Sequence, residues 1–346
     1  MSQESAGKTA AGAVSEQRVA ELHGCIAQVR SEVAKVIVGQ EEIIEQVLMS
    51  IFAGGHCLMI GVPGLAKTLM VRTFAQALRL SFKRIQFTPD LMPADITGSE
   101  VVEEAADRTK RFTFVEGPLF ANMILADEIN RAPARTQAAL LEAMQEHSIT
   151  VGRRSHRLSE PFFVLATQNP IEQEGTDPLP EAQQDRFMFF LHVRYPLSHE
   201  EVDVIKRTTT TTEPRAEPAM SGEEIVEVQR LVRGVPVADH VTRYASRVVR
   251  ASRLDRGDEG DGGIPDFVRK YVEWGAGPRA GQYLVLGAKA RAFLQNRSHA
   301  SVEDIRAVAY PVLRHRVIVN FAAQADGIDS SWVIGRLLAD VPERVD

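Results

Sequence analysis

The sequence predicts an α/β fold with a parallel sheet over residues 18–195, followed by a smaller all-helical domain over residues 196–346. Two observations lead to this prediction. Short apolar runs alternate with helical patterns as far as Tyr195-Pro196, which is typical of a parallel sheet with helices on both faces. Beyond that point the pattern is mostly helical, with loops between the helices. Residues 1–17 are mostly small and polar, so we expect them to be disordered.

Composition and charge narrow the class of protein. The chain has 346 residues, of which 44% are apolar and 25% charged, as in soluble globular proteins. The net charge of −6 argues against a dedicated nucleic-acid binder. The two cysteines, Cys25 and Cys57, form neither a disulfide framework nor a zinc pattern. No apolar run has the length of a membrane span or a signal peptide, so we expect a cytoplasmic protein.

Two helices and a short strand open the folded part of the chain. Apolar residues three and four positions apart predict an amphipathic helix over Val19–Val36. A second helix is expected over Glu41–Phe52, and the apolar run His56–Ile60 is expected to be a strand. The next strand is predicted over Phe82–Phe87.

The stretch Ile60–Leu69 carries the strongest chemical signal. A glycine-rich turn between a buried strand and a helix, ending in Lys-Thr, is typical of the phosphate-binding loop of nucleotide hydrolases. Gly61 and Gly64 allow the backbone to wrap closely around an anion. Lys67 would bring a charge to the terminal phosphates, and the Thr68 hydroxyl would bind Mg²⁺. The loop residues expected to contact the nucleotide are Gly61, Val62, Pro63, Gly64, Leu65, Ala66, Lys67, Thr68 and Leu69.

Two residues of this loop, Ala66 and Pro63, need comment because of the backbone that they provide for binding phosphate. The consensus has glycine where this chain has Ala66. Because that position opens a helix, we expect right-handed backbone angles, which alanine adopts without strain. Pro63 has no N–H to donate and would stiffen the turn instead.

Asp127 and Glu128 follow four apolar residues, Met123–Ala126. This pattern predicts a buried parallel strand that brings two carboxylates to its carboxyl end, where open α/β sheets bind ligands. Neighbouring residues of a strand point in opposite directions. We therefore expect Asp127 to bind Mg²⁺ and Glu128 to act as the base that activates water.

A further strand is predicted over Phe162–Thr167 and is followed by Asn169. An amide at the tip of a strand beside the acid-bearing one can hydrogen-bond both water and a terminal phosphate. The helical turn that ends before Arg186 leads into a last strand, Met188–His192.

Two segments of the first domain admit two readings each. Thr88–Gly117 is irregular, with a charged segment before a short apolar run at Phe112–Val115. It is either a binding insert or a surface loop.

Ser148–Ser159 follows a strong helix at Ala134–Glu146 and is predicted to be a hairpin. Its basic residues either bind nucleic acid or an acidic protein, or form a solvated charge cluster; they are Arg153, Arg154, His156 and Arg157.

The second domain is predicted to consist of six helices joined by loops. A glycine-rich acidic segment, Asp255–Gly263, is expected to be a flexible loop. The predicted helices are Ser198–Lys206, Ser221–Val232, Asp239–Leu254, Val268–Gly275, Arg279–Asn296 and Val302–Leu313.

Taken together, these motifs resemble those of the AAA+ ATPases and, among them, of the MoxR family. The resemblance covers about Val36 to Phe321. It implies an AAA+ P-loop nucleotide-binding domain followed by a helical lid domain. The motifs that carry it are Gly61-Val-Pro-Gly-Leu-Ala-Lys-Thr68, Ala126-Asp-Glu-Ile-Asn-Arg-Ala-Pro133, Ala166-Thr-Gln-Asn-Pro170, Glu181-Ala-Gln-Gln-Asp-Arg-Phe187 and Gly277-Pro-Arg-Ala280.

The resemblance also implies roles for single residues. Val38 and Gly39 would line the adenine pocket, Thr88–Gly98 would be the insert typical of this group, and Ser148–Ser159 the hairpin before sensor 1. Gly277 stands where Ser or Thr is usual and should loosen the start of the helix that carries Arg279. Whether Arg279 acts on its own subunit or on a neighbour is left open. The implied catalytic set is Lys67 and Thr68 of Walker A, Asp127 and Glu128 of Walker B, Asn169 as sensor 1, Arg186 as arginine finger and Arg279 as sensor 2.

At the level of function, the resemblance implies an ATPase that binds ATP and Mg²⁺ and assembles into a homo-oligomeric ring, often a hexamer. Such proteins act like chaperones in remodelling, maturing or metallating other proteins, together with partners that contain von Willebrand factor A domains. No residue pattern names the client protein. Two alternatives remain: a motor that translocates nucleic acid, and a nucleotide-gated assembly scaffold with little hydrolysis.

Overall fold

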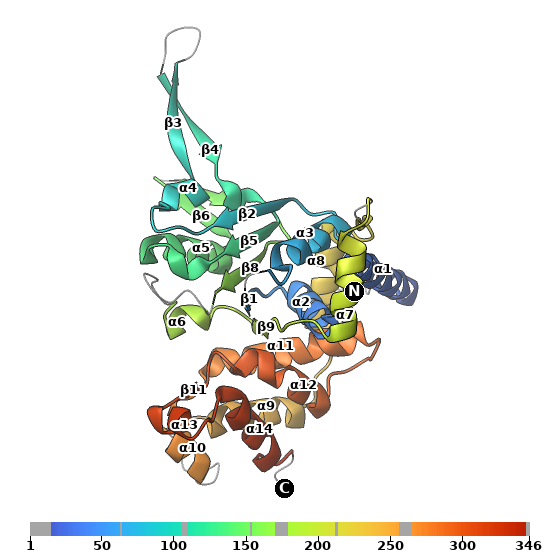
Figure 1. Ribbon diagram of the computed structural model, residues 1–346, viewed down its shortest axis with the longest axis vertical. Coiled ribbons are helices and arrows are strands. Elements are labelled where there is room, and N and C mark those ends of the chain that lie inside the picture. Colours follow the sequence, from blue (N-terminus) through green and yellow to red (C-terminus); the bar gives the residue numbers. More distant parts are fainter. Residues whose placement is uncertain are drawn as a thin grey trace, which may run out of the picture.

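The computed structural model describes residues 15–62, 64–104, 110–152, 154–169, 179–211, 214–255 and 264–343 (Figure 1). Most of the segment expected to be disordered, the acidic loop after residue 255, Pro63 and Arg153 lie outside the described residues. In Figure 1 a core built around a sheet lies above a group of helices that contains the carboxyl terminus. No described helix is both long and apolar enough to cross a membrane.

The centre of the core is a parallel sheet, as the alternating pattern predicted. Its five strands have the order β2-β5-β8-β1-β9, and each lies within two residues of the strand expected from the sequence. The chain reaches neighbouring parallel strands through helices, because such connections need a crossover. The strands are β1 Cys57–Ile60, β2 Phe82–Gln86, β5 Met123–Asp127, β8 Phe163–Gln168 and β9 Phe189–His192.

Both faces of the sheet are covered. Successive strand residues point to opposite faces, so Cys57 and Met59 belong to one apolar core and Leu58 to the other. The first core contains residues of α1 Glu16–Val36, α2 Glu41–Ala53 and α3 Lys67–Ala77, and the second contains those of α5 Ala134–Glu146. These four helices match the prediction; α1 begins within the segment expected to be disordered.

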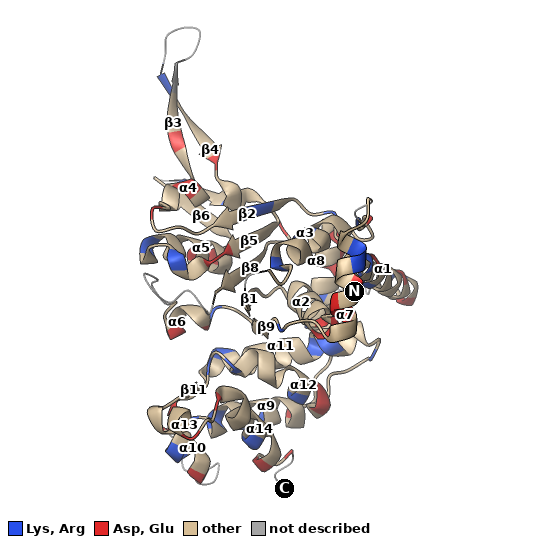
Figure 2. Ribbon diagram, in the orientation of Figure 1, with Lys and Arg blue, Asp and Glu red and all other residues tan. Residues whose placement is uncertain are grey.

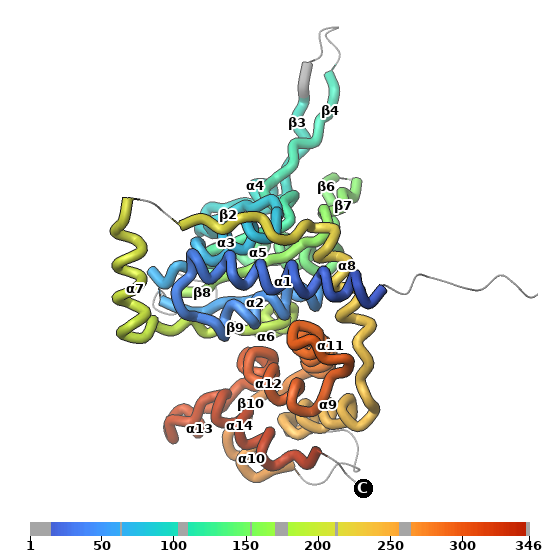
Figure 3. The backbone as a smooth tube through the Cα atoms, turned by 90° about the vertical axis from the view of Figure 1, so that its right-hand side faces the viewer, coloured from blue at the N-terminus to red at the C-terminus, as the bar shows by residue number. Residues whose placement is uncertain are grey.

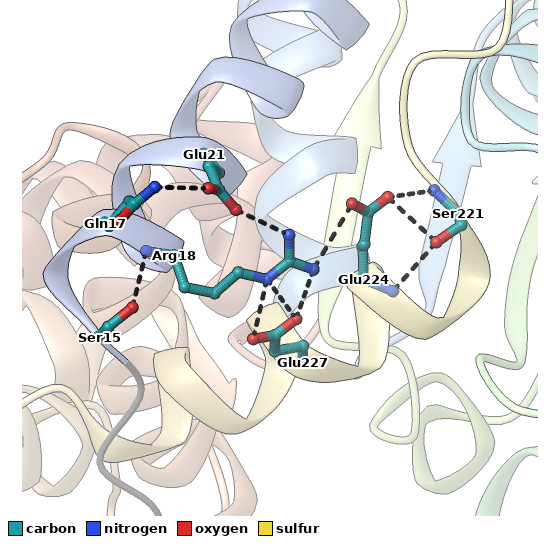
Figure 4. A network of polar contacts seen from close by, with 7 residues as sticks. All are labelled: Ser15, Gln17, Arg18, Glu21, Ser221, Glu224 and Glu227. Carbon is teal, nitrogen blue, oxygen red and sulfur yellow. Dashed lines mark hydrogen bonds and ion pairs between the residues drawn. The ribbon is translucent and has the colours of Figure 1, made fainter.

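The helices beyond residue 195 that contact the core include α7 Ser198–Thr208 and α8 Gly222–Gly234. Further along the chain, α11 Pro278–Leu294 contacts α2 and α12 Val302–Leu313 contacts β9. The apolar face of α8 joins the first core through Ile225, Val228 and Val232. Arg18 of α1 also forms ion pairs with Glu227 at 2.9 Å and Glu224 at 3.6 Å (Figure 4). Exposed ion pairs contribute little free energy, so the apolar contact is what holds α8 against α1 and α2.

The insert differs from the sequence-based expectation. Residues expected to be irregular form a short helix, α4 Pro93–Thr97, and a long antiparallel hairpin of β3 Gly98–Glu104 and β4 Lys110–Glu116, which projects from the core in Figure 1. The hairpin has few buried residues, so its charged positions hid the strand pattern. The second hairpin was predicted correctly and consists of β6 Ser148–Val151 and β7 Arg154–Arg157.

The lid domain is mostly, but not entirely, helical. The helix expected over Val268–Gly275 ends at Tyr271, and Val272–Trp274 forms a strand that pairs with residues 318–319. This pairing joins segments far apart in the chain, which helical periodicity cannot reveal. Figure 3 shows the lid elements gathered on one side of the core. They are α9 Asp239–Ala251, α10 Asp266–Tyr271, β10 Val272–Trp274, α11 Pro278–Leu294, α12 Val302–Leu313, β11 Ile318–Val319, α13 Phe321–Ala325 and α14 Ser330–Asp340.

Candidate functional site

The predicted phosphate loop connects β1 to α3 at the carboxyl edge of the sheet. Gly61 is buried, and a Cβ atom on it would lie 2.9 Å from the Cβ of Val193, which follows β9. Only glycine fits at that contact without displacing β9. Gly64 has a φ of +87° and open space around it, which exposes the backbone of the loop. Both glycines are therefore needed, each for a different reason.

The backbone of Ala66 contradicts our expectation. It lies in the left-handed region, with φ +55° and ψ +23°, immediately before α3. The prediction of right-handed angles was wrong because Ala66 is the N-cap, a flanking position where the chain turns from the loop into the helix. An L-residue in this conformation is disfavoured by about 1–2 kcal/mol.

We therefore expect Ala66→Gly to stabilise the protein without nucleotide. Relief of the backbone strain outweighs the greater entropy of glycine in the unfolded chain, for a net gain of about 0.5–1 kcal/mol in the free energy of unfolding. Denaturant titration measures it. Ala138→Gly, in the exposed interior of α5, is the matched control and should destabilise. A loss of stability in Ala66→Gly as large as in the control would show that position 66 is unstrained.

Lys67 points back into its own loop. Its Nζ donates a hydrogen bond to the carbonyl oxygen of Gly61 at 2.6 Å. Burial lowers the pKa of Lys67, while the nearby Asp127 and Glu128 carboxylates oppose that shift. The amino terminus of α3 begins at this residue, so a lysine charge and helix N–H groups are directed at the same small volume, which suits an anion.

Asp127 ends β5 and is held from two sides. Its Oδ1 accepts a hydrogen bond from the Thr167 hydroxyl at 2.6 Å. Its Oδ2 accepts from Arg84 of β2, at 3.0 Å from Nε and 2.7 Å from Nη2. This single carboxylate and a hydroxyl such as that of Thr68, in the first turn of α3, are oxygen ligands of the kind that suit Mg²⁺, which takes few protein ligands and keeps water or phosphate in its other positions. The described residues contain no cluster of three or more His, Cys, Asp or Glu side chains that could hold a metal alone.

Glu128 is fixed by a second set of contacts. Its backbone is left-handed, with φ +56°, and its N–H donates to Thr167 Oγ1 at 2.9 Å. Its Oε2 accepts hydrogen bonds from Gln86 Nε2 at 2.7 Å and from Arg131 Nη1 at 3.0 Å. The carboxylate is therefore positioned by a side chain of β2 and by one from the turn that follows β5.

The sequence did not single out Arg84, Gln86, Arg131 or Thr167. Arg84 and Gln86 lie two residues apart and share one face of β2, and β2 pairs with β5 so that Gln86 is opposite Asp127. The sequence does contain one hint, namely two polar residues on the same face of a strand near its carboxyl end. This hint points to the site only once β2 is known to be the neighbour of β5.

Asn169 follows β8 and is only 5% exposed. The strand β8 lies between β5, which carries the acids, and β1, which leads into the phosphate loop. The sheet therefore brings together Lys67, Thr68, Asp127, Glu128 and Asn169, as expected from their positions at strand ends.

Val38 and Gly39 lie in the turn between α1 and α2 and are partly buried. Gly39 has a φ of +65°, and a Cβ atom there would collide with the carboxyl group of Glu200 in α7. The start of α7 thus closes the outer side of the segment expected to line an adenine pocket.

Arg186 and Arg279 lie away from the phosphate loop and the residues gathered around it. Arg186 follows the short helix α6 Glu181–Gln184, and its carbonyl oxygen accepts a hydrogen bond from Tyr283 of α11 at 3.1 Å. Arg279 forms an ion pair with Asp185 at 2.9 Å. In Figure 1, α6 and α3 lie on opposite sides of the sheet. Within one chain the two arginines are thus neighbours of each other and are not part of the phosphate-loop cluster.

Arg316 anchors this second group and was not predicted. It is almost fully buried and binds Asp185 Oδ1 at 2.7 Å and the Phe187 carbonyl oxygen at 2.7 Å. Burial lowers the pKa of Arg316, and the Asp185 carboxylate opposes the shift. The lid thus fixes the backbone on both sides of Arg186. The sequence could not predict this contact, because it depends on how the lid packs against the segment that follows α6.

Comparison with known proteins agrees with this geometry. Residues 56–189 match the ATPase family associated with various cellular activities (AAA), and residues 266–334 match the AAA lid domain. The chain is 42% identical to chaperone MoxR1 of Mycobacterium tuberculosis over 310 residues, which cover 90% of this chain and 80% of that protein. It is 30% identical to protein MoxR of Methylorubrum extorquens, covering 85% and 87%. A crystal structure of a candidate ATPase from Cytophaga hutchinsonii superposes with a TM-score of 0.85 at 41% identity, over 94% of this chain and 97% of that one.

Proposed function

The chain belongs to the MoxR family of AAA+ ATPases, and we propose that it hydrolyses ATP to ADP and phosphate at the carboxyl edge of its sheet. One observation carries this proposal. The sheet gathers an anion-binding loop with its lysine, two adjacent carboxylates and a buried amide within one small region. A protein that only bound nucleotide would need the loop but not Glu128.

Each residue of this region has a chemical role in the proposal. Lys67 exchanges its hydrogen bond to Gly61 for the β- and γ-phosphates, and the loop N–H groups bind the remaining oxygens. Thr68 and Asp127 hold Mg²⁺, which when bound neutralises phosphate charge. Glu128, held by Gln86 and Arg131, accepts the proton of the attacking water. Asn169 orients that water and the γ-phosphate, and Val38 and Gly39 border the adenine.

Arg186 and Arg279 complete the site from a neighbouring subunit. Within one chain the ion pair of Arg279 runs to Asp185, next to Arg186 and on the side of the sheet away from α3 (Figure 1). A second copy that presents this edge to the phosphate loop would place both guanidinium groups near the γ-phosphate. In this proposal Arg279, like Arg186, acts in trans, which is supported by its ion pair with Asp185. The proposal requires a homo-oligomer, which we propose to be a hexameric ring.

The cellular role follows from the family. We propose a cytoplasmic, chaperone-like ATPase that remodels, matures or metallates client proteins together with a partner that has a von Willebrand factor A domain. A relative carries the name chaperone, which supports this role. A nucleic-acid motor is disfavoured by the net charge of −6 and by the dispersal of Lys and Arg among acidic residues over core and lid (Figure 2).

The binding step is tested with Lys67→Ala. We expect this variant to lose measurable ATP binding by calorimetry, because the charge paired with the β- and γ-phosphates is removed. Lys83→Ala, an exposed lysine of β2, is the matched control and should bind as the parent protein does. Undiminished ATP affinity in Lys67→Ala would refute the assignment of the phosphate loop. Steady-state ATPase assays of the parent protein, with and without DNA, then distinguish a protein remodeller from a DNA motor. The same assays distinguish both from an assembly scaffold with little hydrolysis.

A further inference from the structure

The carboxyl end of α7 carries a run of exposed threonines. Thr208 is the last residue of the helix and Thr209 is its C-cap, and the run continues to Thr211 in the described part of the chain. None of the residues of α7 is buried, and a helix of 11 residues is marginal in water on its own. The end of α7 can therefore unwind without uncovering an apolar core, and its hydroxyl groups are accessible.

The threonine hydroxyls serve as donors that close this end of the helix. The last carbonyl groups of a helix have no N–H partner within it. Thr209 Oγ1 donates a hydrogen bond to the carbonyl oxygen of Ile205 at 2.7 Å. Thr208 Oγ1 donates one to the carbonyl oxygen of Val204 at 2.8 Å. A reaction that removes the hydroxyl proton of Thr209 would take one of these donors away from the last turn.

Arg207 joins the end of α7 to the end of α1. Its Nη1 donates hydrogen bonds to the carbonyl oxygens of Ala34 and Lys35, both at 3.2 Å. These carbonyl groups belong to the last turn of α1, where a cation is favourable because the helix dipole is negative at that end. The contact holds the exposed end of α7 against the core.

The segment beneath α7 leads into the proposed adenine position. α1 ends at Val36, and Val38 and Gly39 follow. At the other end of α7, the carboxyl group of Glu200 lies against Gly39. The helix α7 therefore rests at both of its ends on the stretch that joins α1 to α2.

We propose that Thr209 is a phosphorylation site and that its phosphorylation releases α7 from α1. The modifying enzyme would be a protein Ser/Thr kinase that recognises basic residues before the acceptor. Lys206 and Arg207 stand three and two positions before Thr209. In the reaction, Thr209 Oγ1 attacks the γ-phosphorus of ATP bound to the kinase, the bond from that phosphorus to the ADP oxygen breaks, and a base of the kinase takes the hydroxyl proton.

The phosphate weakens the end of α7 through both charge and hydrogen bonding. The ester oxygen of phosphothreonine can no longer donate to the carbonyl oxygen of Ile205. The phosphate also carries a charge of about −1.5 to −2 at pH 7, which is unfavourable at the negative end of a helix dipole. Both effects favour unwinding of the last turn.

Unwinding in turn allows Arg207 to change partner. Residues two positions apart on a helix do not face each other, so Arg207 reaches the phosphate on residue 209 only after the last turn has opened. A charge-assisted hydrogen bond to phosphate is stronger than one to a neutral carbonyl oxygen. Arg207 then leaves Ala34 and Lys35, and α7 loses its attachment to α1.

Thr113 is a matched control within the same chain. Lys110 and Arg111 stand three and two positions before it, so its sequence context is that of Thr209. Thr113, however, pairs with Val101 in the ladder of β3 and β4. A strand must leave this ladder before a kinase can bind it, whereas the end of α7 only has to unwind. We therefore expect phosphorylation of Thr209 in preference to Thr113.

The experiment treats the full chain with ATP and the catalytic subunit of cyclic AMP-dependent protein kinase, which prefers basic residues at these two positions. Mass spectrometry locates the phosphate, and hydrogen exchange is measured after ATP has been removed. We expect the amides of α7 to exchange about tenfold faster in the phosphorylated protein. Thr209→Val, treated in the same way, should exchange nearly as slowly as the untreated parent. Untreated Arg207→Gln should exchange faster, because it lacks the contact with α1.

Three outcomes would overturn the inference: no phosphate on Thr209, preferential modification of Thr113, or slow exchange of α7 in the phosphorylated protein or in Arg207→Gln. The consequence for ATP rests on the proposed function, and the affinity for a fluorescent ATP analogue should fall severalfold on phosphorylation. Failure of the proposed function is distinguishable, since the untreated parent would then not bind the analogue, while the exchange of α7 would still respond to the kinase.

Discussion

Glu128→Gln should bind Mg-ATP with the affinity of the parent protein and hydrolyse it about 10²–10⁴ times more slowly. An amide cannot accept a proton from water, whereas its oxygen can still accept the hydrogen bonds that Gln86 and Arg131 now donate to the carboxylate. The geometry of the site should thus survive the substitution while its base is lost. Calorimetry measures binding, and single-turnover phosphate release measures the chemical step.

The matched control for this experiment is Glu142→Gln, an exposed glutamate on α5, which should retain parental turnover. If Glu128→Gln hydrolysed ATP at the parental rate, the base would have to be another residue. The slow variant would also be useful in itself, since an ATP-bound protein that does not turn over can retain client proteins for identification.

Arg186→Ala should lower the rate of hydrolysis by about 10³–10⁵ while ATP still binds. The expected cause is loss of a guanidinium that stabilises charge on the phosphoryl group during transfer. The competing explanation, an ion pair with Asp185, is weakened by the structure, because Asp185 is already paired with Arg279 and Arg316.

Turnover of Arg186→Ala is compared with that of Arg243→Ala, a 75% exposed arginine side chain on α9, which should be unaffected. A rate for Arg186→Ala within a few-fold of the parental rate, in a protein that assembles normally, would show that Arg186 is a surface residue without a role in catalysis.

Much of the core could be predicted because its signals are local. Buried parallel strands are short apolar runs, so β1, β5 and β8 are visible in the sequence, and the residues that end them fall at one edge of the sheet. Lys67, Asp127, Glu128 and Asn169 could therefore be grouped without knowledge of the strand order. Their roles in hydrolysis stay predictions until they are measured.

The residues that were missed depend on contacts between distant segments. Gln86 and Arg84 matter only because β2 pairs with β5, and Arg316 only because the lid packs against the segment that follows α6. The strands β10 and β11 lie more than forty residues apart in the sequence, so no hydrophobic periodicity could predict that they pair. The left-handed backbone of Ala66 was missed for a local reason. A rule for residues inside a helix was applied to the residue that caps it.

The central claim is that the ATP site of one copy is completed by Arg186 of the next, and the most direct test is a mixture of two inactive variants. Lys67→Ala should fail to bind ATP, and Arg186→Ala should bind it without hydrolysis. When the two are mixed, some interfaces pair an intact phosphate loop with an intact Arg186, so part of the parental ATPase activity should return. No recovery in mixtures shown to co-assemble, or full activity of the parent as a monomer at high dilution, would contradict the account.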